Sequence, residues 1–283
     1  MKTALVLEGG GLRGIYSAGV LDFLLENNIK VDAIFGVSAG ALYGINYASK
    51  QEGRVIRYNK KYIRDKRFMS FRNLIKTGNF FDTDFCYDKL VNELDVFDYE
   101  TFKNSGIDFY AVITNVETGK PEYKLIKDCK KEVDYLRASG SLPLLSQIVE
   151  IDGKKYLDGA IGDSIPVKKA REMGYDKIIV IQTRIKTYRM KSRKEGTLIK
   201  MAYKHYPKFG EAAKTRYIRY NEALDYIKEE VKNKRMFSIQ PSKYVKISRL
   251  EKNPDKLQEM YDLGWNDATN IINDLKAYLS EGE

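Results

Sequence analysis

Ser38 is the residue of this chain most suited to chemistry, because Gly36 and Gly40 flank it in the sequence G-V-S-A-G. Residues 31–37 form an apolar run typical of a strand, and residues 39–49 favour a helix. A serine at such a sharp turn is held in a strained backbone that exposes its hydroxyl, and the two glycines allow close approach of strand and helix. The N-terminus of the helix also favours negative charge on an attacked carbonyl. The pattern predicts a nucleophile for acyl transfer, and a glycine-rich turn with an incidental serine is the alternative.

A second glycine-rich turn follows the first predicted strand, residues 3–8. Its spacing also fits G-x-G-x-x-G, but a dinucleotide site needs an acidic residue at the end of the second strand, where this chain has Ser38. Neighbouring strand-to-helix turns of a parallel sheet lie side by side, so we expect this loop to form an oxyanion hole beside the serine. The expected donors are the N–H groups of Gly10 and Gly11, with Leu12 as a further candidate. The loop consists of Gly9, Gly10, Gly11, Leu12, Arg13 and Gly14.

The serine needs a general base, and two side chains are candidates. Asp158 opens the sequence D-G-A after a predicted hairpin, and the chain's single histidine, His205, lies in a basic C-terminal segment. A triad of Ser38, Asp158 and His205 would follow the chain order of α/β-hydrolases, although their elbow normally follows several strands and this one follows the second. We expect Asp158 to act alone. Because an aspartate of pKa about 3.9 is a weak base, the oxyanion donors and the helix dipole must then supply more of the rate.

The elements that must position these residues form an α/β pattern. Two hairpins, a short helix and a buried strand are predicted over residues 107–126, 148–157, 132–138 and 177–182. From residue 184 the chain becomes helical, with a short strand near 237–239 and a final amphipathic helix after Asn253, which we expect to pack on the sheet. We therefore expect a catalytic core of residues 1–183 and a mostly helical C-terminal extension, residues 184–283, packed on the same domain.

Composition places the chain among globular proteins, since 43% of its 283 residues are hydrophobic and 31% are charged. The two cysteines, Cys86 and Cys129, lie far apart, which predicts neither a disulfide framework nor a zinc site. We expect no metal and no cofactor. The apolar run at the start is too short for a signal peptide, and no stretch approaches the roughly 20 apolar residues that span a membrane. These features predict a cytoplasmic location.

The net charge of +10 is unevenly distributed. Residues 54–79 carry a net charge of +8 and residues 184–219 one of +10, whereas the remainder is net negative. Aromatic residues are interleaved in both basic stretches. This pattern suits peripheral contact with an anionic membrane, at the inner membrane surface, more than nucleic-acid binding; solvated helix faces are the alternative.

Four blocks occur in order, at residues 9–14, 36–40, 138–143 (A-S-G-S-L-P) and 158–160. Together they resemble the patatin-like phospholipase family, from residue 3 to about 183. The resemblance implies a three-layer α/β fold with a mostly parallel sheet. It also implies a lipid acyl hydrolase with a serine–aspartate dyad and an oxyanion hole. The residues implied are Ser38 and Asp158 for the dyad, Arg13 at the family's basic position, and Gly36, Gly40 and Gly159 as support for the motifs.

The leading interpretation is a serine hydrolase of the patatin type that cleaves an acyl ester of a lipid, as a phospholipase A, a lysophospholipase or another carboxylic ester hydrolase. One alternative is a soluble short-chain carboxylesterase that uses His205 in a triad. The other is a basic module that binds membrane or nucleic acid and carries a vestigial site.

Overall fold

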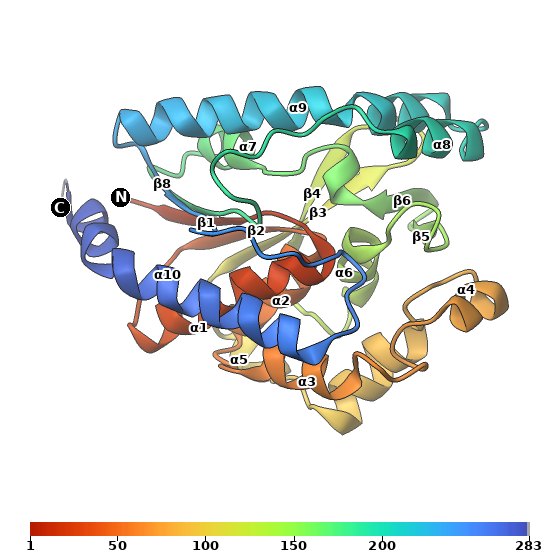
Figure 1. Ribbon diagram of the computed structural model, residues 1–283, viewed down its shortest axis with the longest axis horizontal. Coiled ribbons are helices and arrows are strands. Elements are labelled where there is room, and N and C mark those ends of the chain that lie inside the picture. The colour runs from red at the N-terminus through yellow and green to blue at the C-terminus, as the bar shows by residue number, and fades with distance from the viewer. Residues whose placement is uncertain (282–283) are drawn as a thin grey trace.

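The computed structural model describes residues 1–281, which are built around an eight-stranded sheet (Figure 1). The strands are β1 (Thr3–Leu7), β2 (Ala33–Val37), β3 (Asp108–Asn115), β4 (Pro121–Ile126), β5 (Val149–Ile151), β6 (Lys154–Asp158), β7 (Lys177–Ile181) and β8 (Met236–Ile239). Their order is β5-β6-β3-β2-β1-β7-β8, and β4 also pairs with β3. The pairs β3–β2, β2–β1, β1–β7 and β7–β8 are parallel. The pairs β3–β4, β3–β6 and β5–β6 are antiparallel.

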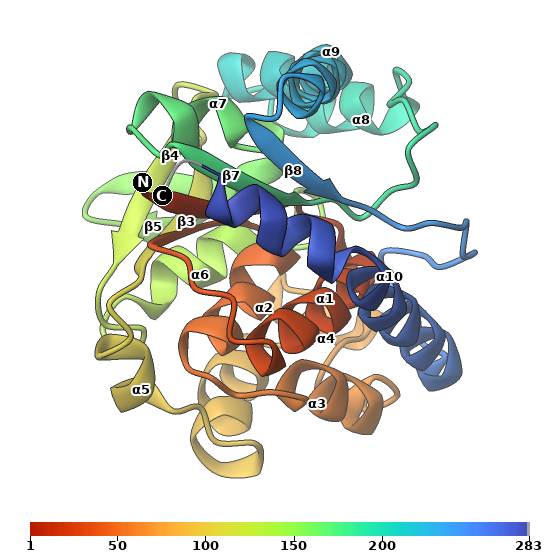
Figure 2. The same ribbon diagram turned by 90° about the vertical axis from the view of Figure 1, so that its left-hand side faces the viewer.

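Helices cover both faces of this sheet. The α-helices are α1 (Ile15–Glu26), α2 (Ala39–Ala48), α3 (Arg54–Tyr62), α4 (Phe71–Thr77), α5 (Tyr99–Lys103), α6 (Val133–Gly140), α7 (Val167–Glu172), α8 (Lys194–Ala202), α9 (Pro207–Lys232) and α10 (Pro254–Ser280). Short 3₁₀ turns, η1 (Gly11–Gly14) and η3 (Gly159–Ile161), and a π-helix, η2 (Phe85–Leu94), complete the chain. Figure 2 shows α7, α8 and α9 on one side of the sheet and α1, α2, α3 and α10 on the other. The predicted three-layer α/β fold is confirmed.

The central strands are apolar throughout because both of their faces are covered. In β1, Leu5 and Leu7 belong to the core on the α1 and α2 side, whereas Ala4 and Val6 belong to the core on the α7 and α9 side. All four side chains are fully buried. The alternation of a strand's side chains therefore divides each central strand between two cores.

Both predicted hairpins are confirmed. β3 and β4 pair in antiparallel register from Phe109 with Ile126, and β5 and β6 pair from Val149 with Tyr156. The two residues that connect β5 to β6, Asp152 and Gly153, have φ values of 51° and 72°. Positive φ at both central positions is the mark of the type I′ turn, whose twist matches that of the strands. This turn directs β6 so that its last residue is Asp158.

The C-terminal hundred residues contribute to the same sheet and to both helical layers. β8 pairs with β7 in parallel, and α9 covers the face opposite α1. The prediction that the last helix packs on the sheet holds only for its C-terminal end, where the hydroxyl of Tyr278 accepts from the N–H of Ile178 in β7; over most of its length α10 lies against α1. Gly19 of α1 and Gly264 of α10 permit this: a Cβ at either position would lie 2.1 Å from a backbone carbonyl oxygen of the other helix. Two glycines thus let the helix backbones approach closely.

Candidate active site

Ser38 lies at the turn from β2 into α2 and has φ 55° and ψ −123°. A positive φ is uncommon for a residue with a Cβ and stores backbone strain. The flanking glycines make the turn possible, since a Cβ at Gly36 would lie 2.5 Å from the Cα of Ala41 and a Cβ at Gly40 2.6 Å from the carbonyl oxygen of Leu7. The geometry is that of a nucleophile elbow, with the hydroxyl at the carboxyl end of the parallel strands.

The hydroxyl of Ser38 donates a hydrogen bond to the carboxylate of Asp158, with 2.7 Å between Oγ and Oδ2. Sheet register explains how residues 120 positions apart meet. Val37 of β2 pairs with Val112 of β3, and the next residue of β3, Ile113, pairs with Asp158 of β6. Ser38 and Asp158 therefore flank the same point of β3 and reach toward each other over it.

The Asp158 carboxylate is buried, and burial raises its pKa above the ordinary value. The hydrogen bond from Ser38, the N–H of Ala160 and the positive charge of Arg216 act in the opposite direction. The Ala160 N–H donates to Oδ1 at 2.8 Å, so both carboxylate oxygens are engaged. A desolvated carboxylate that holds the serine proton by a short hydrogen bond is arranged to accept that proton.

The glycine loop after β1 lies directly against Ser38. A Cβ at Gly9 would be 3.0 Å from the Cβ of Ser38, and Gly10 and Gly11 follow at the start of η1. Among residues 1–281, no backbone carbonyl outside this turn accepts a hydrogen bond from the N–H of Gly10 or Gly11. N–H groups without an outside acceptor, beside a serine, are the kind of donor that can bind a carbonyl oxygen.

The structure does not fit the expectation that the N–H of Leu12 is a further oxyanion donor of this loop. Its N–H donates to the carbonyl oxygen of Arg249 at 3.1 Å. Arg249 belongs to the segment between β8 and α10, which crosses the loop so closely that a Cβ at Gly11 would lie 2.6 Å from the same oxygen. The segment that occupies this donor comes from more than 200 residues away in the chain.

Ser139 is a site residue that motif matching does not assign. Its Oγ accepts a hydrogen bond from the N–H of Ser38 at 2.9 Å and donates one to the carbonyl oxygen of Val112 at 2.7 Å. The carbonyl of Ser141 accepts from the N–H of Asp158 at 2.9 Å. The block A-S-G-S-L-P thus braces both Ser38 and Asp158. The signal in the sequence is the block A-S-G-S-L-P itself, which the sequence alone singles out without a role for Ser139.

The structure does not bring His205 to this site. It lies exposed in the turn between α8 and α9 and lines neither of the cavities that reach Ser38. Ser38 and Asp158 contact each other without a histidine between them. The triad geometry is therefore absent from residues 1–281.

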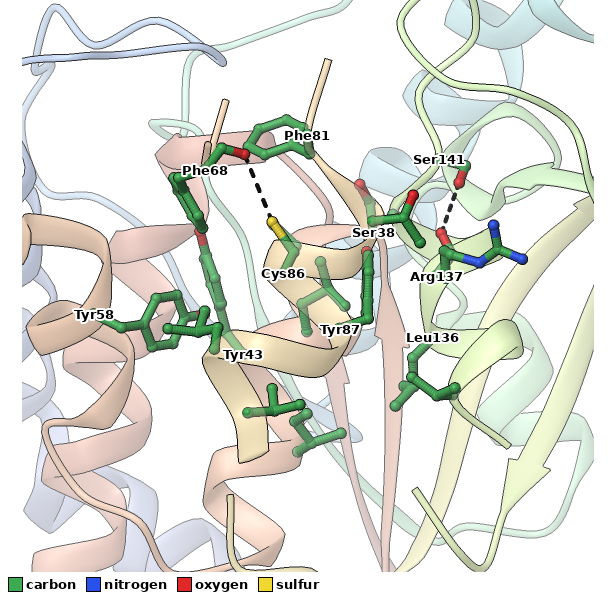
Figure 3. A pocket seen from close by; sticks show the side chains of 18 of the residues that line it. Ser38, Tyr43, Tyr58, Phe68, Phe81, Cys86, Tyr87, Leu136, Arg137 and Ser141 are labelled. Atoms are coloured by element: carbon green, nitrogen blue, oxygen red, sulfur yellow. Dashed lines mark hydrogen bonds between the residues drawn. The ribbon is translucent and has the colours of Figure 1, made fainter. Parts of the chain in front are cut away.

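One cavity beside Ser38 is apolar and has a volume of about 140 Å³. It runs from the serine between α2, α6 and the π-helix η2, whose side chains wall it (Figure 3). Among the described residues, Arg54 and Arg137 are the only charged ones that line it. Its aromatic and aliphatic walls include Tyr43, Tyr58, Phe68, Phe81, Tyr87 and Leu136. An apolar channel that ends at Ser38 suits a hydrocarbon chain.

A second cavity, of about 110 Å³, opens on the other side of the same serine. Gly11, Ser38 and Leu142 line both cavities. The walls of the second are polar and basic, and include Arg13, Arg184, Arg216 and Arg249. Ser38 thus lies at the junction of an apolar and a cationic space. Within the described chain, no group of three or more His, Cys, Asp or Glu side chains is placed to hold a metal ion.

The comparisons with family models and with related sequences each cover part of the chain. The family model described as patatin-like phospholipase matches residues 5–171, and a model described as a domain of unknown function, DUF6363, matches residues 206–280. The protein YjjU of Escherichia coli is 32% identical over 186 residues, which cover 64% of this chain. Lysophospholipase nte1 of Aspergillus fumigatus is 32% identical over 188 residues, and that of Aspergillus niger 31% over 189.

These relatives are longer than the part that aligns. The alignments span 52% of YjjU and 12% of each fungal lysophospholipase, so the chain spans about half or less of their length. Among solved structures, VipD from Legionella pneumophila aligns with 96% of this chain and 67% of its own. The sequence identity of that pair is 13% and its TM-score is 0.45.

Proposed function

This chain belongs to the patatin-like phospholipase family, and from that premise we propose that it hydrolyses an acyl ester of a lipid with Ser38 as nucleophile and Asp158 as base. The observation that carries the proposal is the 2.7 Å hydrogen bond between these side chains at a strained elbow. Fungal relatives named lysophospholipases support a lipid ester as the substrate class. Because only parts of these relatives align, head group and chain length do not carry over from them.

In the proposed reaction, Asp158 takes the proton of the Ser38 hydroxyl while Oγ attacks the ester carbonyl carbon. The N–H groups of Gly10 and Gly11 stabilise the resulting oxyanion. The bond to the alcohol then breaks, and the alcohol leaves with the proton from Asp158. Asp158 next takes a proton from water while the water oxygen attacks the acyl-serine ester. The bond between the acyl carbon and Oγ then breaks, Asp158 returns the proton to Oγ, and the fatty acid and free Ser38 are released.

The apolar cavity supplies the place for the acyl chain. Its walls are aromatic and aliphatic, and it begins at Ser38, so a chain laid in it would bring its carboxyl carbon to the nucleophile. Burial of each methylene group contributes about 0.8 kcal/mol. We therefore assign the acyl group to this cavity and the alcohol of the ester to the other side of Ser38.

The proposal includes peripheral contact with an anionic membrane. Two short helices, α4 and α8, lie at the same end of the molecule in Figure 1, the end at which the parallel strands finish. Each exposes large apolar side chains among basic ones: Ile75 of α4 is 86% exposed and Met201 of α8 is 68% exposed. Apolar side chains ringed by lysine and arginine suit the interface of a bilayer with acidic lipids. Within residues 1–281, no helix combines the length and apolarity needed to cross a bilayer.

Labelling with a fluorophosphonate tests the catalytic assignment, because only an activated serine reacts at an appreciable rate. We expect the wild-type chain to be labelled at Ser38 and to hydrolyse p-nitrophenyl esters. Ser38→Ala should lose both properties and keep the fold, since alanine lacks only the nucleophile.

Ser17→Ala is the matched control for this test. Ser17 is also fully buried, but its Oγ has no hydrogen-bond partner among the described residues. Its removal should leave labelling and hydrolysis unchanged. Labelling that persists in Ser38→Ala, or more than a few per cent of residual activity, would contradict the assignment. A wild-type chain that is never labelled would favour a basic binding module instead.

A further inference from the structure

We propose that two arginines of α9, Arg216 and Arg219, position the turn that carries Asp158, so that the C-terminal extension completes the proposed catalytic site. This inference rests on the proposed function and adds positioning residues to it. Both arginines lie within residues 206–280, which match the model described as a domain of unknown function, and outside residues 5–171, which match the family. The role of that region is then to hold the base against Ser38.

Arg219 binds the carbonyl end of the turn η3, which begins directly after Asp158. Its Nη2 donates to the carbonyl oxygen of Ile161 at 2.9 Å, and its Nε donates to that of Gly162 at 3.2 Å. Nη2 also donates to the carbonyl oxygen of Ala212 within α9 itself. Because the donors of a guanidinium lie in one fixed plane, this side chain fixes the turn relative to α9.

A chain of hydrogen bonds leads from Arg216 to the carboxylate of Asp158. Nε of Arg216 donates to the hydroxyl of Ser164 at 2.9 Å, and that hydroxyl donates to the carbonyl oxygen of Ala160 at 2.8 Å. The N–H of Ala160 in turn donates to Oδ1 of Asp158 at 2.8 Å. Since Oδ2 is the oxygen that accepts from Ser38, this chain holds the carboxylate in the rotation that presents Oδ2 to the serine.

The sheet holds the opposite side of the same turn. Oγ1 of Thr114 in β3 donates to the carbonyl oxygen of Asp158 at 2.8 Å and accepts from the N–H of Gly162 at 3.0 Å. The turn lies so close to β3 that a Cβ at Gly159 would be 2.1 Å from the carbonyl oxygen of Val112. The turn is therefore clamped between β3 and α9, and without α9 it would be held from one side.

Arg216 also brings a positive charge toward the base, since it lines the second, cationic cavity beside Ser38 together with Asp158. Burial raises the pKa of Asp158, and the hydrogen bond from Ser38 and the charge of Arg216 act against this effect. Arg249, from the segment before α10, acts in the same direction as Arg216, and Tyr87 of η2 is a further titratable group that interacts with the charge of Asp158. Loss of the Arg216 charge should therefore raise the pKa of Asp158.

The pH profile of ester hydrolysis tests Arg216. The substrate is p-nitrophenyl butyrate, which is uncharged, so that the guanidinium cannot act by binding an anionic group of the ester. Because Asp158 must be ionised to take the serine proton, kcat falls as the pH drops through its pKa. Arg216→Gln should move this fall to a pH higher by about 1, the lower end of the effect of one nearby opposite charge. Arg216→Lys keeps the charge and should leave the profile close to that of the wild type.

A merely structural role of Arg216 would lower kcat at every pH and leave the shape of the profile unchanged. An acidic limb that stays in place in Arg216→Gln would therefore overturn the proposal.

Arg219→Gln tests the clamp. We expect kcat at the optimal pH to fall about tenfold or more, since a small displacement of a catalytic group is costly, and KM to stay within about twofold because both cavities are intact. Hydrogen exchange should become faster at residues 158–163 and remain unchanged in α2. Arg219→Lys should recover part of kcat. An unchanged kcat, or exchange that rises equally over the whole chain, would contradict a positioning role.

Lys228→Gln is the matched control. Lys228 lies in the same helix and carries the same charge, but it is exposed and lines neither of the cavities that reach Ser38. Its kcat, its pH profile and its hydrogen exchange at residues 158–163 should equal those of the wild type. A pH profile that moves equally in Lys228→Gln and Arg216→Gln would show that only net charge matters, and would overturn the proposal.

An NMR titration separates this proposal from the catalytic one. The carboxyl carbon of Asp158, assigned by its loss in Asp158→Asn, titrates whether or not the chain hydrolyses an ester. Its pKa should be higher in Arg216→Gln than in the wild type and unchanged in Lys228→Gln. If the wild type hydrolyses no ester, the catalytic proposal fails, and this titration and the hydrogen exchange alone decide whether α9 positions Asp158. Equal pKa values in the wild type and Arg216→Gln would overturn that role.

Discussion

At the scale of single residues, the proposed base illustrates how burial alters a weak acid. Asp158 is 1% exposed, and loss of water raises its pKa, whereas Ser38, Ala160 and the charge of Arg216 stabilise the ionised form. A carboxylate with a raised pKa is a better proton acceptor than an aspartate in water. Catalysis then requires a pH above that raised pKa.

Asp158→Asn is expected to lower kcat by several orders of magnitude, because the amide cannot take the serine proton. The same substitution should not lower the stability of the protein at pH 7. A group whose pKa is raised by folding contributes stability that is fully present below its unfolded pKa and is lost as the pH rises through its folded pKa. The variant should therefore have a melting temperature at pH 7 that is equal to or higher than that of the wild type, with a smaller difference near pH 4.

Asp225→Asn serves as a comparison, because its effect on stability should depend on pH in the opposite direction. Arg189 lowers the pKa of the exposed Asp225 carboxylate through their hydrogen bonds, so its contribution is present above its unfolded pKa and is lost at lower pH. Thermal melts of both variants from pH 4 to pH 8, with ester hydrolysis measured in parallel, give the two signs. A lower melting temperature for Asp158→Asn at pH 7 than at pH 4, relative to the wild type, would contradict this account of the base.

At the scale of elements, the site depends on strand register and on backbone crossings that only glycine permits. Ser38 follows β2, the loop of Gly10 follows the neighbouring strand β1, and Asp158 ends β6, which is separated from β2 by β3. Behind them, α1 begins at the end of the glycine loop and carries α10 on its outer face. The contact between α1 and α10 therefore supports the position of the loop.

Gly264→Ala is expected to destabilise the protein by roughly 1–3 kcal/mol or more, the scale of overpacking in a core. The added Cβ would lie 2.1 Å from the carbonyl oxygen of Tyr16, a backbone atom that cannot move without shifting α1. Urea denaturation measures the change. Lys276→Ala, an exposed position of the same helix, should leave stability within about 0.5 kcal/mol. Equal stability of Gly264→Ala and the wild type would mean that the two helices separate easily.

At the scale of the whole molecule, the two basic stretches belong to different layers. Residues 54–79 include α3 and α4, on the side of α1, and residues 184–219 include α8 and the first half of α9, on the opposite side. Both stretches reach the end of the molecule that carries α4 and α8 (Figure 1). That end is the part of the surface where both stretches can face one bilayer.

Vesicle sedimentation tests this surface. We expect binding to vesicles that contain anionic lipid, weaker binding at physiological salt than at low salt, and little binding to zwitterionic vesicles. The double variant Ile75→Ser/Met201→Ser removes one exposed apolar side chain from each helix and should lower the bound fraction several-fold. Val231→Ser, at the far end of α9, is the control for loss of an exposed apolar residue and should bind like the wild type.

Two results would contradict the membrane surface. Equal and negligible sedimentation with both vesicle types would leave the basic stretches as solvated helix faces. Tight binding to duplex DNA without binding to vesicles would favour nucleic acid as the partner, since each phosphate neutralised adds to a salt-dependent affinity.

The sequence by itself determined the local features of this protein. The strand, glycine loop and elbow at residues 3–40 and the two hairpins follow from patterns of neighbouring residues, because backbone propensity and side-chain periodicity act over a few positions. The three-layer class was implied by the resemblance to the family. The same patterns also singled out Ser38 and Asp158 as separate candidates. These patterns do not indicate how far apart Ser38 and Asp158 lie in space.

Only the tertiary structure decided which distant groups meet. The register of β3 with β2 and β6 brings Asp158 to Ser38, the segment before α10 occupies the N–H of Leu12, and three arginines of the C-terminal extension gather around one cavity with Arg13. Such contacts join residues one hundred or more positions apart, and they form because the whole core must bury its apolar faces at once. No local sequence pattern indicates which distant surfaces pack together. The pairing of α10 with α1 and the cationic cavity are therefore seen only in the folded structure.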